Sequence, residues 1–165
     1  MVDTVVIWNV VTAPATLAVL AATLLLAWPL GRRRGRAGVL FVLVFGGILA
    51  ATATTTPAYP AASGVEPYLA GFGSPGYLFG GFGSNLERLA NIGLYLPLGL
   101  IGTLLWARPV TVLAGCAGLS FLLEAWQGLI GRSGDAVDVV HNTVGALVGV
   151  LIARGWTYLA SQGTV

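Results

Sequence analysis

Charged residues are scarce in this sequence, and lysine is absent altogether. Only 8% of the 165 residues are charged and 56% are hydrophobic, whereas a soluble globular domain has about a quarter charged residues. This balance excludes a soluble core and is typical of a membrane protein. The arginines do not form the continuous basic face that nucleic acid requires. We therefore predict a lipid bilayer as the surroundings and no nucleic-acid partner.

The sequence also has a single histidine and a single cysteine, His141 and Cys116. These two residues do not supply the three or four ligands that a zinc site needs. No Ser/His/acid triad, Walker loop or dinucleotide fingerprint occurs. A magnesium site that combines Glu124, Asp135 and Asp138 with substrate oxygens stays open, but the pattern is unspecific. We predict no metal and no cofactor.

Long apolar runs dominate the rest of the chain. A membrane-spanning helix needs about 20 apolar residues, and five segments approach or exceed this length. We expect an all-α integral membrane helical bundle that forms a single transmembrane domain over residues 1–165. The predicted transmembrane helices cover residues 5–30, 37–56, 86–106, 109–131 and 136–158. The first is expected to be a retained helix, because no basic region precedes it and its apolar run is too long for a signal peptide.

The stretch "GRRRGR" at 31–36 sets the predicted orientation, because arginine-rich short loops stay in the cytoplasm. The N-terminus, the segment 57–85 and the turn 131–135 are then extracytoplasmic, and the C-terminus is cytoplasmic. The five tryptophans all fall toward predicted helix ends, where indole rings anchor at the membrane interface. The segment 57–85 is a Gly- and aromatic-rich loop. We interpret it as an interfacial linker, with a lid or lipid-facing flap as the alternative.

Polar residues gather at the outer ends of the last three predicted helices. Glu124 lies sixteen residues after Arg108, or about 24 Å along a helix, and therefore inside the hydrocarbon zone. A carboxylate at that depth is costly unless it faces the bundle interior, a wet cavity or a partner, so it indicates a functional site. We predict one polar pocket open to the outer face. Its predicted binding residues are Glu87, Arg88, Asn91, Glu124, Gln127, Arg132, Asp135, Asp138 and Asn142.

Some of these residues also have a structural interpretation. Gln127, Asn142 and Ser120 can bond helices to one another, and Gly145 and Gly149 form a small-xxx-small pair that permits close packing. Asp135, at the start of the last helix, can serve as a cap that favours the helix dipole. His141, as a lone histidine, is more often a packed hydrogen-bonding residue than a catalytic one.

Three blocks of the sequence carry a family resemblance: "NIGLYLPLG" at 91–99, "SFLLEAWQ" at 120–127 and "RSGDAVDVVHNTVGALVG" at 132–149. Together they resemble the signature blocks of the VanZ-like family, over about residues 86–155. Two residues depart from the family pattern, since Gly134 stands where an aromatic is common and His141 replaces an apolar residue. The resemblance implies a multi-pass protein of the bacterial cell membrane. The family is named after a member that gives low-level teicoplanin resistance.

Three functions remain open at this point. The pocket is expected to bind an amphiphilic envelope ligand, either a lipid-linked wall precursor or a lipoglycopeptide, and so to influence glycopeptide susceptibility. Alternatively, the protein is a membrane enzyme that acts on a lipid-linked envelope precursor, with Glu124 and Asp138 as catalytic candidates. In the third alternative it is a purely structural membrane scaffold.

Overall fold

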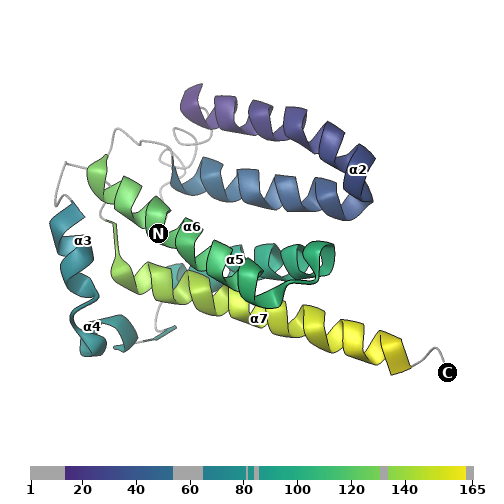
Figure 1. Ribbon diagram of the computed structural model, residues 1–165. Helices are drawn as coiled ribbons and strands as arrows, with labels where there is room; N and C mark the ends of the chain where they lie inside the picture. Colours follow the sequence, from purple (N-terminus) through teal and green to yellow (C-terminus); the bar gives the residue numbers. More distant parts are fainter. Residues whose placement is uncertain (1–13, 54–64, 81, 84–85, 131–133, 163–165) are drawn as a thin grey trace. The chain divides into compact units, whose positions relative to one another are not determined.

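The computed structural model describes residues 14–53, 65–80, 82–83, 86–130 and 134–162. Every regular element within these ranges is a helix, which confirms the predicted all-α class (Figure 1). The helices are α2 (Pro14–Thr52), α3 (Val65–Gly71), α4 (Pro75–Phe79), α5 (Leu86–Trp106), α6 (Pro109–Leu129) and α7 (Ala136–Gln162). Among the described residues, the helices α2, α5, α6 and α7 are long and apolar enough to cross a membrane.

The chain divides into two compact units, each of which joins two stretches of sequence. The first unit comprises Met1–Ala70 and Leu123–Asp135, and the second comprises Gly71–Leu122 and Ala136–Val165. The first unit therefore contains α2, most of α3 and the end of α6. The second contains α4, α5, most of α6 and α7.

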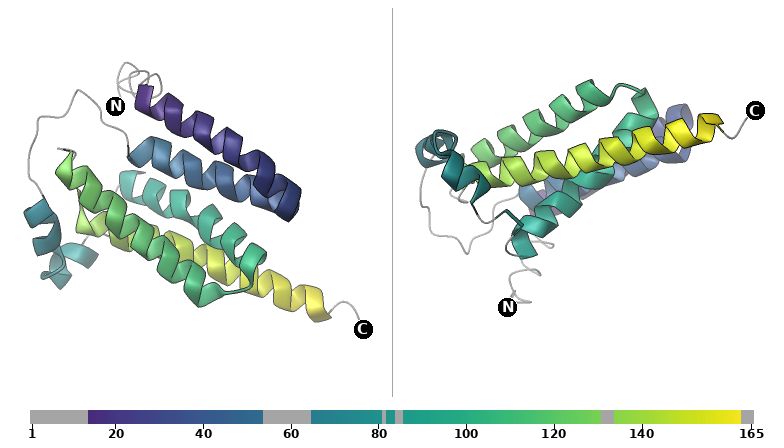
Figure 2. Two further views of the ribbon diagram at one scale, coloured as in Figure 1. Left: turned by 45° about the horizontal axis from the view of Figure 1, so that its top comes forward. Right: turned by 90° about the horizontal axis from the view of Figure 1, so that it is seen from below.

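In the first unit, α2 is a helical hairpin with its turn at Gly35. The turn requires glycine, because Gly35 has a φ of 63° and a ψ of −158°, a left-handed conformation that side chains disfavour. The two arms run side by side (Figure 1; Figure 2, left). They pack closely at Gly46, where any side chain would collide with Thr23 of the other arm.

The two helices that the sequence predicts here are present as the two arms of α2, but the link between them is shorter than the predicted range 31–36. The arginines of this stretch are helical, because arginine is a good helix former, and only Gly35 leaves the helical conformation. Residues 5–13 of the first predicted helix and 54–56 of the second lie outside the described residues.

The described part of the segment 57–85 is not a simple loop. It contains the short helices α3 and α4, and α4 starts with Pro75 at its first position, where the missing N–H of proline costs nothing. Among its described aromatic side chains, Tyr77, Phe79 and Phe82 are exposed, whereas Tyr68 is buried. Phe72 contacts Phe121 of α6, with ring centroids 5.8 Å apart.

In the second unit, α5 and α7 pack along a seam of glycines. A side chain at Gly145 would collide with the carbonyl oxygen of Ile92, and one at Gly149 would collide with that of Leu96. A side chain at Gly99 of α5 would in turn collide with the backbone of Ala146. The predicted close packing of Gly145 and Gly149 is therefore confirmed, and α5 is the helix that they contact.

The sequence predicted the boundaries of these last three helices closely. The predicted range 86–106 is confirmed for α5. The helix α6 ends at Leu129 rather than at residue 131. The helix α7 continues past the predicted residue 158 to Gln162, where Ser161 bonds back to the carbonyl oxygen of Tyr158 at 2.7 Å.

Candidate functional site

In the first unit, the buried carboxylate of Glu124 is the centre of a polar cluster. Glu124 lies near the end of α6 and is only 4% exposed. Its Oε2 accepts a hydrogen bond from the backbone N–H of Asp135 at 3.1 Å. Asp135 directly precedes α7, as the sequence predicts. The structure thus brings together two of the predicted site residues.

Gly134 lies very close to the backbone at the end of α6. A Cβ atom at this position would collide with the backbone carbonyl oxygen of Glu124 and stand 3.1 Å from the backbone nitrogen of Gly128. Glycine is therefore required for the close approach. Gly134 is one of the two departures noted in the sequence, and in this chain a larger side chain would not fit against this backbone.

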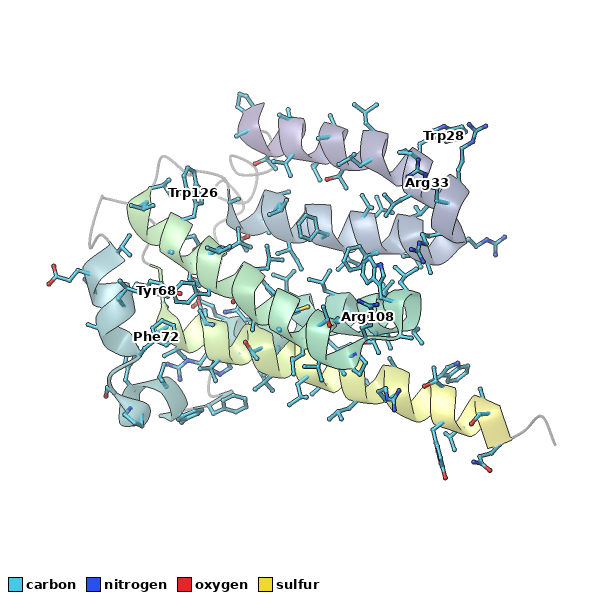
Figure 3. All side chains as sticks on the ribbon, viewed as in Figure 1. Trp28, Arg33, Tyr68, Phe72, Arg108 and Trp126 are labelled. Atoms are coloured by element: carbon cyan, nitrogen blue, oxygen red, sulfur yellow. The ribbon has the colours of Figure 1, made fainter. Side chains whose placement is uncertain are left out.

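Tyr68 of α3 is the third member of the cluster, and sequence reasoning does not single it out. Its side chain is 2% exposed, and Figure 3 shows it on α3. Burial raises the pKa of the Tyr68 hydroxyl, and the negative charge of Glu124 raises it further. Tyr68 therefore keeps its proton in neutral solution and can donate a hydrogen bond.

The charge of Glu124 can be detected through Tyr68. In an alkaline ultraviolet titration, we expect Glu124→Gln to lower the pKa of Tyr68, but not to its ordinary value of about 10, because burial is the larger cause of the shift. Since the folded state holds this proton more tightly than the unfolded state, stability should fall as the pH rises above about 10. Subtracting the titration of Tyr68→Phe assigns the signal. An unchanged or higher Tyr68 pKa in Glu124→Gln would contradict the proximity of the two groups.

The end of α6 is also joined to the end of α2 in the first unit. The Trp126 side chain donates from Nε1 to the carbonyl oxygen of Ala53 at 2.9 Å. The Trp126 side chain remains 46% exposed. This exposure suits an indole ring that anchors at a membrane interface. Figure 3 shows Trp126 at this end of α6. The bond fixes the helix end that carries Glu124.

In the second unit, Asn142 and Ser120 form a buried pair. The Nδ2 of Asn142 donates to the Ser120 hydroxyl at 2.9 Å, and both side chains are at least nine-tenths buried. The Oδ1 of Asn142 has no hydrogen-bond partner among the described residues. The pair joins α6 to α7, as in the structural interpretation, and it leaves a buried acceptor that suits a water or a bound donor.

His141 is completely buried beside this pair. Its Nε2 accepts the backbone N–H of Gly83 at 3.2 Å, and its Nδ1 lies 2.8 Å from the carbonyl oxygen of Val137. With Nε2 as the acceptor of the Gly83 N–H, Nδ1 is the nitrogen that can donate to the Val137 carbonyl oxygen. The Phe82 ring stacks on the imidazole at 4.5 Å. His141 is thus a hydrogen-bonded packing residue, as the sequence suggests.

The remaining predicted site residues are spread over both units. Arg88 is half-buried and donates from Nη1 to the carbonyl oxygen of Gly80 at 3.0 Å. Glu87 is exposed, whereas Asn91, Gln127 and Asp138 are half-buried. Arg132 lies outside the described residues. No group of three His, Cys, Asp or Glu side chains suited to a metal ion occurs within the part of the chain that the structure describes.

Comparison with known proteins gives one match. A family model described as VanZ/LLP1 matches residues 48–159. No curated protein and no solved structure matches the chain. The matched range includes α3 to α6, nearly all of α7 and every one of the predicted binding residues.

Proposed function

The chain belongs to the VanZ/LLP1 family of membrane proteins, and we propose that it binds an amphiphilic envelope molecule through the Glu124 cluster. The proposed ligand is a lipid-linked wall precursor or a lipoglycopeptide. Binding it would influence susceptibility to teicoplanin-type glycopeptides. We place the Glu124 end of α6 on the extracytoplasmic side in this proposal, because the arginines at 31–36 favour the cytoplasm.

The burial of the Glu124 carboxylate is the observation that carries this proposal. Glu124 is 4% exposed on a helix long and apolar enough to cross a membrane. Ionisable residues in membrane segments are expensive and mark ligand or ion sites by default. A carboxylate accepts hydrogen bonds from the hydroxyl, amide and ammonium groups that occur in sugar and peptide headgroups. Tyr68, whose hydroxyl lies within the field of the Glu124 charge, belongs to the same cluster.

The hairpin of α2 supports a five-crossing topology in this proposal. Its first arm, residues 14–34, is about 31 Å long and its second, 36–52, about 25 Å long at about 1.5 Å per residue. These lengths are close to the hydrocarbon thickness of about 30 Å. With α5, α6 and α7, the two arms give five crossings, an extracytoplasmic N-terminus and a cytoplasmic C-terminus.

The proposal is tested by Glu124→Gln in a strain that lacks its own copy of the gene. The amide has nearly the same shape and still accepts the Asp135 N–H, so we expect wild-type abundance in the membrane. We expect teicoplanin susceptibility to resemble that of the deletion strain, because the negative charge is lost. Asp138→Asn serves as a parallel variant in the second unit. Full complementation by Glu124→Gln at normal abundance would reject the Glu124 cluster as the site.

A structural role for Glu124 is the second candidate, and the Asp135 hydrogen bond favours it. In that case the carboxylate holds the turn between α6 and α7 and binds nothing else. Glu124→Leu, which leaves the Asp135 N–H without its acceptor, should then remove the protein from the membrane, while Glu124→Gln should preserve both abundance and susceptibility. The two candidates therefore differ in the phenotype of Glu124→Gln.

A further inference from the structure

A second, unrelated site lies at the turn of α2. A cavity of about 510 Å³ opens there. Leu24, Ala27, Trp28 and Val39 form its apolar wall, and Arg32 and Arg36 also line it. Its volume falls within the range of about 300–1,000 Å³ that is usual for small-molecule sites.

Arginines lie beside this largely apolar cavity, and two of them, Arg32 and Arg36, contribute to its lining. Four arginines occur between residues 32 and 36, and no acidic residue occurs anywhere in Pro14–Thr52. The Arg32 guanidinium lies 5.3 Å from the centroid of the Trp28 ring, close enough for a cation–π contact. This contact holds one cation against the apolar wall. Figure 3 shows Trp28 and Arg33 at this turn.

The surroundings of the cavity indicate what fills it. Leu24 and Leu25 on the first arm are 64% and 75% exposed, so this face of α2 requires hydrocarbon. An occupant must therefore combine an apolar chain with an anionic group. Arginine binds phosphate through two parallel hydrogen bonds, and basic pockets beside membrane helices bind anionic headgroups.

We propose that the cavity at the α2 turn binds an anionic phospholipid of the surrounding membrane. The acyl chain lies along Leu24, Trp28 and Val39, and the phosphate binds Arg32 and Arg36. Gly31 lets the Val39 side chain lie close to the first arm, because a Cβ at position 31 would come within 2.6 Å of the Val39 side chain. This site shares no residue with the Glu124 cluster, so it does not depend on the function proposed above.

The four arginines offer a matched test, because Arg32 and Arg36 line the cavity and Arg33 and Arg34 do not. The variants are Arg32→Gln/Arg36→Gln and Arg33→Gln/Arg34→Gln, each of which loses the same formal charge. Full-length protein is taken from vesicles of phosphatidylcholine and phosphatidylglycerol, and native mass spectrometry counts the lipids that stay bound. We expect the wild type to retain phosphatidylglycerol. Retention should be at least about tenfold weaker in the cavity pair, because it loses both direct phosphate contacts, and only slightly weaker in the other pair.

Leu24→Trp keeps all four arginines and occupies part of the apolar wall. We expect it to lower phosphatidylglycerol retention several-fold. Size-exclusion chromatography shows whether the Arg32→Gln/Arg36→Gln variant is folded, and Leu24→Trp provides the test if it is not. Equal losses in the two arginine pairs would overturn the proposal in favour of diffuse charge attraction. Equal retention of phosphatidylcholine would overturn the requirement for an anion. Displacement of the lipid by inorganic phosphate alone would show that the apolar wall takes no part.

Discussion

Replacement of Gly149 by valine is expected to remove most of the folded protein from the membrane. A Cβ atom at Gly149 would collide with the carbonyl oxygen of Leu96 and stand 2.7 Å from the backbone nitrogen of Leu100. Both neighbours are backbone atoms of α5, so no side chain can rotate to make room. The two helices must separate, which costs about 3 kcal/mol or more, a large part of the stability of a typical domain.

Gly155 provides the matched control, because it lies on the same helix and has open space around its Cα. Gly155→Val makes the same change of helix propensity without a collision. We expect it to accumulate and to melt near the wild-type temperature, as measured by size-exclusion chromatography and thermal unfolding in detergent. If both valine variants are lost equally, helix propensity or membrane insertion is responsible, and the α5–α7 seam does not have the importance assigned to it.

The glycine seam was predictable because its signal is local. Gly145 and Gly149 are four residues apart and therefore face one direction on a helix, and small residues at this spacing permit helices to pack closely. The boundaries of α5, α6 and α7 were predictable for a similar reason. Each is an apolar run of membrane length, bounded by proline, arginine or a Gly-rich turn.

The turn of α2 and the short helices α3 and α4 were harder to predict. Arginines and glycines at 31–36 suggest a non-helical link, but only Gly35 leaves the helical conformation. The segment around α3 and α4 contains many glycines and prolines, which usually interrupt helices. Helices of seven and five residues are too short to show a clear hydrophobic period.

The candidate site was predictable in part. The depth of Glu124 along α6 is a prediction from residue counting, and in the structure its side chain is buried. The involvement of Tyr68 did not follow, because it lies more than fifty residues earlier in the chain, and only tertiary structure brings it near Glu124. The hydrogen bond from Gly83 to His141 could likewise not be predicted from the sequence, because Gly83 lies in a separate segment of the chain.

Replacement of His141 by leucine is the second change with a large expected effect. The buried imidazole accepts from Gly83 N–H and lies within hydrogen-bonding distance of the Val137 carbonyl oxygen, and leucine can do neither. A buried donor that loses its acceptor costs about 1–3 kcal/mol, and the lost Phe82 stacking adds about 0.5–1.5 kcal/mol. We therefore expect His141→Leu to destabilise the protein by about 2 kcal/mol or more. The melting temperature should fall, and hydrogen exchange at the Gly83 amide should become faster.

Thr143→Val on the same helix separates this effect from a general loss of polar groups in α7. The Thr143 hydroxyl donates to the Val139 carbonyl oxygen at 2.7 Å, an acceptor that the helix already satisfies. Its removal should change stability by less than about 0.5 kcal/mol and leave exchange at Gly83 unaltered. If His141→Leu melts like the wild type and Gly83 exchanges no faster, the imidazole does not hold the Phe82–Gly83 turn. Its burial would then reflect side-chain packing alone.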